Sequence, residues 1–338
     1  MEPADALDRI AYLLDRAREP SAKARAFLRA AAVVRGLDPD ELRERVAGGR
    51  LTDLPGIGDS TARVITEAMA GEVPAYLQRL EGQSGVPEGE GAAIRAALRG
   101  DCHTHSTWSD GGAEIETMAR AAAELGHEYV VLTDHSPRLT IAHGLSRDRL
   151  LAQLDEVAEV NERVAPFRIL TGIEVDILED GGLDQDDDLL GRLDVVVASV
   201  HSKLRMERDA MTRRMVMAVA NPHVDILGHC TGRIVVGRGR PPSTFDAELV
   251  FAACERFDVA VEINSRPERL DPPDELLALA VETGCRFSID TDAHAPGQLE
   301  WQPYGCDKAA RTGVPVDRVV NAWGADDLVE WAASHGGR

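Results

Sequence analysis

Short apolar runs alternate with amphipathic stretches through the second part of the chain, and this alternation limits the possible fold more than any other feature. The apolar runs cover residues 100–102, 129–132, 168–170, 195–198, 224–227, 259–263 and 287–289. Helical stretches lie between them, at residues 114–125, 147–164, 210–220, 247–257 and 274–283. Such alternation is typical of βα units and a parallel sheet. We therefore predict an α/β barrel of about seven βα repeats over residues 100–338.

The first part of the chain has a different pattern. Leu7, Ile10 and Leu14 are spaced for one face of a helix, and Asp38 with Pro39 can start another. We predict a small all-helical domain over residues 1–81. The Gly-rich stretch that follows lacks apolar periodicity, so we expect a linker over residues 82–99.

A tight turn, Leu54-Pro55-Gly56-Ile57-Gly58, lies between two expected helices of this domain. It has the pattern of a helix-hairpin-helix element. The N–H groups of Gly56, Ile57 and Gly58, with the following helix amino terminus, could hold a nucleic-acid phosphate without reading bases. The alternative is a simple connection between helices.

Histidines and acidic residues follow the ends of the predicted strands. In βα folds the active site lies at these strand ends. Six of the ten histidines occupy this position, which scattered structural histidines would not do. With Asp110 from the Ser109-Asp110-Gly111 turn, the set contains six histidines and three carboxylates: His103, His105, Asp110, His135, Glu174, His201, His229, Asp292 and His294. Only the run that ends at Glu262-Ile263-Asn264 departs from the pattern.

Imidazole and carboxylate ligands without thiolates suit Mn²⁺, Zn²⁺ or Fe²⁺, and nine ligands exceed what one tetrahedral ion can use. We predict three divalent ions with positions left open for water and substrate. Three dications against three carboxylates suit a phosphate ester, and metal-bound water can ionise near neutral pH. A metal-bound hydroxide would then be the nucleophile.

Other residues add narrower expectations. Lys203, Arg233 and Arg266 lie beyond strand ends and either contact a substrate phosphate or pair with carboxylates. Three further histidines, His127, His223 and His335, are expected at the surface.

The net charge of −21 argues against nucleic acid as a partner, although bound cations would offset part of it. No apolar run is long enough for a membrane span, and five scattered cysteines form no CxxC pair. We expect a cytoplasmic protein without membrane partners.

Several motifs together resemble the polymerase-and-histidinol-phosphatase (PHP) family. They are His103 to Gly111, Thr133-Asp134-His135, Ser199 to Ser202, Gly228-His229 and Thr291 to His294. The resemblance is greatest to the PHP domain of bacterial family X DNA polymerases, and residues 1–80 resemble the helical domain of those polymerases. The polymerase palm of that family has no counterpart, so we expect no DNA synthesis. Asp59 departs from the family hairpin, because its charge would oppose phosphate binding.

The resemblance implies a distorted (β/α)7 barrel with a trinuclear site. His103, His105, Glu174 and Asp292 would hold one ion, and Glu174 would bridge to a second ion held also by His201 and His229. Asp110, His135 and His294 would hold the third. The resemblance also implies that the nucleophilic hydroxide is held by Glu174, His201, His103, His105 and Asp292.

The leading hypothesis is a metal-dependent phosphoric ester hydrolase that binds the DNA backbone and acts as a 3′-to-5′ exonuclease or 3′-end processing enzyme. The alternative is a small-molecule phosphomonoesterase similar to histidinol-phosphate phosphatase. A third reading is a noncatalytic DNA-associated module, which the complete ligand set disfavours.

Overall fold

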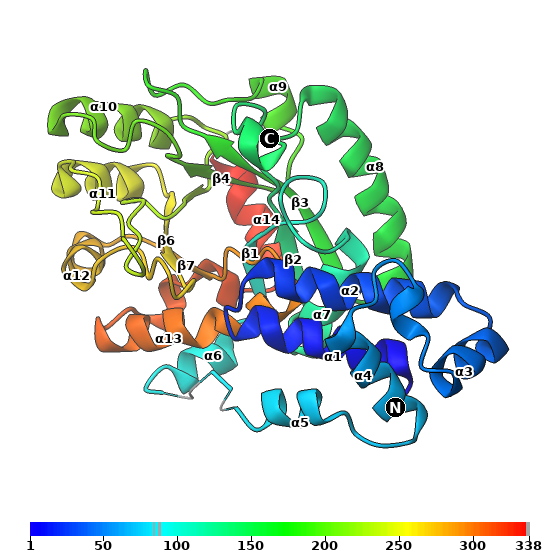
Figure 1. Ribbon diagram of the computed structural model, residues 1–338. Helices are drawn as coiled ribbons and strands as arrows, with labels where there is room; N and C mark the ends of the chain where they lie inside the picture. The colour runs from blue at the N-terminus through cyan, green and yellow to red at the C-terminus, as the bar shows by residue number, and fades with distance from the viewer. Residues whose placement is uncertain (84, 87–88, 336–338) are drawn as a thin grey trace. The chain divides into compact units, whose positions relative to one another are not determined.

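The computed structural model describes residues 1–83, 85–86 and 89–335 (Figure 1). The chain divides into two compact units, Met1–Pro87 with Pro296–Gln298 and Glu88–Ala295 with Leu299–Arg338. No helix of the described residues combines the length and the apolar character needed to cross a membrane.

The first unit is all-helical, as predicted. Its elements are α1 (Pro3–Arg16), α2 (Ser21–Gly36), α3 (Pro39–Ala47), the 3-10 turn η1 (Leu51–Asp53), α4 (Asp59–Met69) and α5 (Ala75–Glu81). Leu7 and Ile10 of α1 are fully buried and share one core with Phe27, Ile65 and Leu77 from the other helices. Burial of these apolar faces, rather than intrinsic propensity, stabilises helices this short.

The predicted linker contains a helix. Within residues 82–99 the chain forms α6 (Ala92–Ala97), and Ile94 and Leu98 are buried in the core of the second unit. The apolar side chains of this short segment are too few to show a period, which is why the sequence suggested a linker. The boundaries at 81 and 99 stay predictions, and residues 84, 87, 88 and 336–338 lie outside the described part.

The second unit is built on seven parallel strands whose order in the sheet equals their order in the chain. They are β1 (Gly100–Thr104), β2 (Tyr129–Leu132), β3 (Arg168–Asp176), β4 (Val195–Ser199), β5 (Ile226–Leu227), β6 (Ala260–Asn264) and β7 (Phe287–Asp290). A parallel bridge between Thr104 and Ala293 joins the first strand to the end of the last. The sheet is thus a nearly closed barrel, and the predicted fold class is confirmed.

Side chains help to join β1 and β7, between which no regular ladder runs. Asp290 accepts a hydrogen bond from the backbone N–H of Cys102 at 2.7 Å, and Asp101 accepts one from the N–H of Thr291 at 3.2 Å. Backbone donors at this seam are therefore satisfied by carboxylates instead of carbonyls. The seam holds β1 and β7 next to each other, and with them His103 in β1 and Asp292 just after β7.

Helices surround the barrel (Figure 1). They are α7 (Ile115–Glu124), α8 (Arg147–Val164), α9 (Asp187–Leu190), α10 (Arg208–Val219), α11 (Ala247–Arg256), α12 (Asp274–Thr283), α13 (Gln302–Arg311) and α14 (Ala325–Ser334), with 3-10 turns η2 (Thr140–Ala142), η3 (Pro296–Trp301), η4 (Val316–Arg318) and η5 (Val320–Ala322). Leu328 and Trp331 of α14 pack with the barrel interior, including Tyr129 and Val195 at the starts of their strands. Because α14 covers the amino end of the barrel, substrate access is left to the carboxyl end.

Strand β3 is longer than the sequence indicated. The apolar run ends at Leu170, but Thr171 and Gly172 continue the strand into Ile173 and Val175. A side chain at position 172 would lie 2.6 Å from Val131, so only glycine lets β2 approach here. Glu174 therefore lies inside a strand and not in the loop after it.

Candidate metal centre

The nine predicted ligands lie together at the carboxyl end of the barrel. His103 is in β1 and Glu174 in β3, and the remaining seven follow strand ends or lie in the loop after β1. A cavity of about 340 Å³ is lined by seven of the nine, all except His103 and His105, which are fully buried beneath it. The structure thus gathers residues that span nearly 200 positions of sequence.

Their ligand atoms form four overlapping groups, within each of which the atoms lie no more than 4.8 Å apart. The groups are His103, His105 and Asp292; His103, Glu174 and His229; His135, Glu174 and His201; and His105, Asp110, His135 and His294. Every predicted ligand belongs to at least one group. Overlap of this kind is what a site for several neighbouring ions requires.

Glu174 is at the centre of these groups. Its Oε1 lies 2.9 Å from Nε2 of His229 and 3.1 Å from Nε2 of His201. Its Oε2 lies 3.4 Å from Nε2 of His103 and 3.7 Å from Nε2 of His105. One carboxylate therefore faces two pairs of imidazoles with different oxygens, as a bridging ligand would.

The third predicted ligand set, which consists of Asp110, His135 and His294, is more exposed to solvent than the other two. Oδ1 of Asp110 lies 3.4 Å from Nε2 of both His135 and His294. His135 also places its Nδ1 2.8 Å from Oε2 of Glu174. His135 thus lies between the second and third sets, whereas the sequence assigned it to the third alone.

Buried polar atoms without partners fit a metal site. Both carboxylate oxygens of Glu174, Nε2 of His103 and both ring nitrogens of His105 are buried and make no hydrogen bond to any described residue. Native proteins rarely leave such groups unsatisfied, because each unpaired polar group has a desolvation cost. Divalent cations among these atoms would satisfy them, so the donor set fits the ions that the sequence predicts.

The carboxylates and His105 have the protonation states that a metal site needs. Burial alone would raise the pKa of Glu174, but the surrounding imidazoles outweigh burial and hold this pKa well below its usual value. Burial opposes ionisation of Asp292 too, yet His105, His103 and two arginines keep its pKa well below normal. Burial, reinforced by the neighbouring imidazoles, lowers the pKa of His105. Burial would lower the pKa of His103, His135 and His201 as well, but Glu174 outweighs burial and raises all three, that of His135 to about 10. Because neutral imidazole is the form that binds metals, ions bound here would displace the protons of these three rings.

Two acidic residues that the sequence did not assign orient the histidines. Oε1 of Glu262 lies 2.5 Å from Nδ1 of His103, and its other oxygen accepts from the backbone N–H of His229. Oδ1 of Asp176 lies 2.7 Å from Nδ1 of His201. Such contacts fix the ring and its tautomer so that Nε2 faces the metal. An acidic residue within an otherwise apolar strand was the signal in the sequence.

The three predicted phosphate contacts have different surroundings. Arg266 lines the cavity and donates to the carbonyl oxygen of Asp292 at 3.0 Å. Arg233 instead donates to the backbone carbonyls of Arg269 and Leu270, so its guanidinium stabilises a loop. Lys203 is exposed and does not line the cavity.

Arg269 was missed by the sequence analysis. It lines the cavity, and its Nε donates to Oδ2 of Asp292 at 3.1 Å. Its Nη1 is buried and has no hydrogen-bond partner among the described residues. A buried cationic donor beside the predicted ligands is a candidate for contacting a phosphate.

The hairpin of the helical unit offers fewer amides than predicted. The N–H of Ile57 donates to the carbonyl of Leu54 at 3.1 Å, and the N–H of Gly58 donates to the hydroxyl of Thr61 at 3.0 Å. Both donors are thus already used within the turn. Gly56 adopts φ 94°, which favours glycine at this position.

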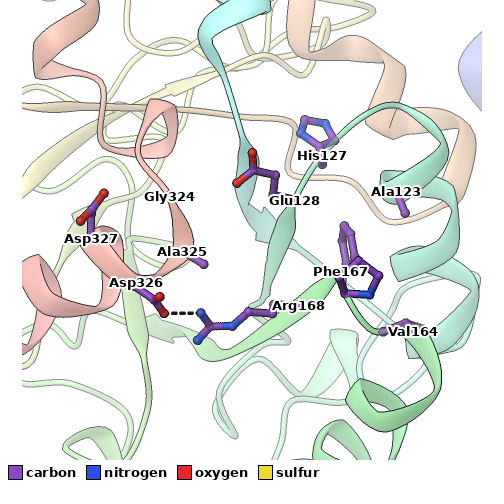
Figure 2. A pocket seen from close by; sticks show the side chains of 11 residues that line it. Ala123, His127, Glu128, Val164, Phe167, Arg168, Gly324, Ala325, Asp326 and Asp327 are labelled. Atoms are coloured by element: carbon purple, nitrogen blue, oxygen red, sulfur yellow. Dashed lines mark hydrogen bonds and ion pairs between the residues drawn. The ribbon is translucent and has the colours of Figure 1, made fainter.

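A larger cavity lies away from the metal centre. It measures about 740 Å³ and lies at the amino ends of β2 and β3, against the start of α14. Figure 2 shows Arg168 paired with Asp326 across it. Glu128 pairs with Arg99 at 2.6 Å. Because no predicted ligand lines this cavity, we place the chemistry in the smaller one.

Comparison with known proteins places the chain in a family. Residues 1–73 match the helix-hairpin-helix domain and residues 101–266 match the PHP domain. A protein named as a probable phosphatase from Thermoanaerobacter sp. (strain X514) is 30% identical over 234 residues, which are 65% of this chain and 89% of that protein. The chain belongs to the PHP family. As a PHP protein with a clustered His, Asp and Glu centre, it is a metal-dependent phosphoesterase, as predicted.

Two further proteins are similar to this PHP protein, one in sequence and one in structure. The DNA polymerase/3′-5′ exonuclease PolX of Bacillus subtilis (strain 168) is 39% identical over 231 residues, 68% of this chain. The chain spans only 40% of the length of that relative. The structure of histidinol phosphate phosphatase from Lactococcus lactis, complexed with zinc, L-histidinol and phosphate, aligns with TM-score 0.44 and 16% identity over 63% of this chain and 94% of the other.

Proposed function

We propose that this PHP protein hydrolyses phosphodiester bonds in DNA, as a 3′-to-5′ exonuclease or 3′-end processing enzyme. The observation that carries the proposal is the presence of a helix-hairpin-helix domain and a PHP domain in one chain. The similarity to a Bacillus protein named for 3′-5′ exonuclease activity supports it. The absence of a polymerase palm between the two domains is consistent with degradation rather than synthesis.

Three divalent ions are part of the proposal. His103, His105 and Asp292 would hold one, His201 and His229 a second, and Asp110, His135 and His294 a third, with Glu174 shared between the first two. Bound there, Mn²⁺, Zn²⁺ or Fe²⁺ would supply Lewis-acid stabilisation of phosphate oxygens and a water nucleophile at neutral pH.

The protein itself contributes orientation and charge. Arg266 and Arg269 lie in the cavity, where their guanidinium groups can donate to the non-bridging oxygens of the scissile phosphate. Arg269 is already held against Asp292, so little side-chain entropy is lost when a phosphate binds. The proposed phosphate contacts therefore keep Arg266 from the sequence-based set, add Arg269, and leave out Lys203 and Arg233.

The helical unit would hold the DNA backbone. The amide of Gly56 and the first-turn amides of α4 would contact a phosphate. Arg63 and Arg79 line a cavity of about 320 Å³ beside this helix start, and the guanidinium of Arg79 lies 4.4 Å from the Tyr76 ring centroid. These two cations offset the charge of Asp59, which lines the same cavity.

We also propose that the protein works in the cytoplasm, since its five cysteines are all buried and form no disulfide.

A small-molecule phosphomonoesterase is the second candidate. The chain covers 89% of a relative named as a probable phosphatase. In that case the helical unit would serve no catalytic purpose.

One experiment separates the two candidates. Mn²⁺-loaded protein is incubated with end-labelled single- and double-stranded DNA and, in parallel, with histidinol phosphate and a generic phosphomonoester. We expect shortening of DNA that is lost in His103→Ala and Asp292→Ala and retained in His223→Ala, a histidine outside the centre. Phosphate release from the small esters with intact DNA would refute the DNA proposal. Arg63→Ala with Arg79→Ala should raise KM for DNA severalfold, while Arg43→Ala on α3 should not.

A further inference from the structure

The rim of the metal cavity carries apolar side chains that the hydrolysis of a phosphate does not need. Leu139, Ile141 and Ala142, from the loop after β2, line the cavity together with Ile234, from the loop after β5. Ile141 is 87% exposed, the highest value among the large apolar side chains of the described residues that are exposed. Val235 and Val236, next to Ile234, are also exposed. A cluster of exposed apolar side chains at the mouth of a site marks a binding surface more often than scattered ones do.

Both loops are fixed in place. In the loop after β2, the N–H of Leu145 donates to the carbonyl of His135 at 2.7 Å, and the guanidinium of Arg149 donates to the carbonyls of His143 and Gly144. A Cβ at Gly144 would lie 1.8 Å from the carbonyl oxygen of Ser136. The exposure of Ile141 is therefore imposed by its backbone.

The second loop is a short antiparallel turn. Ile234 and Arg240 exchange backbone hydrogen bonds of 2.9 and 2.8 Å, and the N–H of Val235 donates to the carbonyl of Glu268 at 2.7 Å. Glu268 itself lines the cavity, which ties this turn to the site. Ile234 is thus presented to the cavity by a defined turn.

The charge of this turn favours a polyanion. Between Ile234 and Arg240 it contains Arg238 and Arg240 but no acidic residue. Neither arginine makes an ion pair with any residue in the described part of the chain, although Nε of Arg240 donates to the carbonyl of Gly232 at 2.6 Å. Surfaces that bind single-stranded nucleic acid combine basic groups that meet the phosphates with side chains, usually aromatic, on which bases pack, and here aliphatic side chains would take the second role.

The size of the cavity limits what can enter. At about 340 Å³ it is near the lower end of the range of roughly 300–1,000 Å³ for small-ligand pockets, so it admits one nucleotide unit and not a duplex. The phosphate of such a unit would lie against Arg266 and Arg269, and its base would extend toward the rim.

From these observations we infer that Ile141 and Ile234 clamp the base of the terminal nucleotide of a single-stranded DNA end. The inference rests on the proposed DNA function. It adds that the site recognises the base of the terminal nucleotide. Because apolar contacts read no base edge, the clamp accepts all four bases and distinguishes an end that carries a base from one that lacks it.

The test uses the full-length Mn²⁺-loaded protein and two single-stranded oligonucleotides, identical except that the 3′-terminal residue of one is abasic. We expect the wild type to prefer the base-bearing end in kcat/KM by about tenfold, and Ile141→Ala and Ile234→Ala each to lose most of that preference. Leu249→Ala removes an exposed leucine on α11, outside the cavity, and this variant should keep the preference for the base-bearing end.

Equal cleavage of both ends by the wild type would overturn the clamp while leaving the DNA function intact. The clamp would also be wrong if the variants slowed both oligonucleotides equally, because the loops would then act on the phosphate or the ions. If the wild type cleaves neither oligonucleotide but hydrolyses a small phosphomonoester, the proposed function fails and the clamp fails with it.

Discussion

Replacement of Glu262 by glutamine should weaken metal binding, although it changes none of the nine predicted ligands. Glu262 is fully buried, and its two oxygens accept from Nδ1 of His103 and from the backbone N–H of His229. Glutamine keeps the volume but has only one acceptor oxygen. In either orientation its NH₂ group faces a donor, so at least one of the two hydrogen bonds is lost.

The size of the effect follows from that geometry. A hydrogen bond to a charged group contributes about 1.5–3 kcal/mol. Loss of an outer contact to a ligating histidine typically lowers metal affinity or activity by about 10- to 100-fold, which corresponds to about 1.4–2.7 kcal/mol. The two figures agree. One orientation of the glutamine loses the contact to Nδ1 of His103 and the other loses the contact to the N–H of His229, so either orientation disturbs a predicted ligand. We therefore expect a 10- to 100-fold loss of affinity for an ion that His103 or His229 binds.

The measurement is the metal content of Mn²⁺-loaded protein after dialysis against graded chelator, by elemental analysis, with thermal melting as a check on folding. Asp176→Asn should have a similar effect through His201. Glu268→Gln is the matched control, because Glu268 lines the same cavity but contacts no predicted ligand. A Glu262→Gln protein that is folded and retains metal like the wild type would refute the argument.

Three further predictions concern stability. Complete removal of metal should lower the melting temperature by at least about 5 °C, since saturation at 100 times Kd stabilises by about 2.7 kcal/mol per site; calorimetry before and after chelation checks this. Gly144→Ala should cost about 1–3 kcal/mol in the free energy of unfolding, because its Cβ would overlap the Ser136 carbonyl, whereas Gly36→Ala, with open space around it, should cost nothing; denaturant titration compares them. Burial alone would lower the pKa of His335, but its contacts with Asp225 and Asp258 outweigh burial and raise this pKa to about 9. The stabilisation is therefore complete below about pH 6.5 and lost as pH rises through about 9, so His335→Phe should be less stable than wild type by about 1–2 kcal/mol at pH 6 but not at pH 10.

The ligand set could be predicted because it depends on chain topology alone. Parallel strands bring their carboxyl ends to one edge, so residues that follow strand ends meet whatever the details of packing. Glu174 lies with the other eight predicted ligands, although the sequence predicted it in the loop after β3 and the structure places it within that strand. The predicted strand ends at Leu170 and the observed strand β3 ends six residues later, at Asp176. Because these extra residues continue toward the carboxyl edge of the barrel, Glu174 still lies at that edge.

Side-chain direction in irregular segments could not be predicted in this way. Arg233 and Arg269 both lie just beyond strands, but tertiary contacts turn Arg233 onto backbone carbonyls and Arg269 into the cavity. His127 and His335 were expected at the surface because they follow helices. Both are buried instead, His127 with a pKa that burial lowers to about 3 and His335 against Asp225. Periodicity carries no information about such contacts.

The net charge of −21 is a poor guide to what a DNA strand would meet. Ten acidic side chains of the described residues are buried, against only two basic ones, so about eight of the 21 net negative charges lie inside the protein. Burial also raises the pKa of Asp101 to about 6 and that of Asp290 well above its usual value, which removes part of this charge. Glu174 and Asp292 would be neutralised by the ions that they bind. The charge that a phosphate backbone meets is set instead by groups on the surface, and next to the cavity-lining Ile234 these include Arg238 and Arg240 in the same turn. Most of the 58 acidic side chains are not buried, so an acidic composition is compatible with an enzyme that acts on DNA only where basic groups such as these lie along the path of the strand.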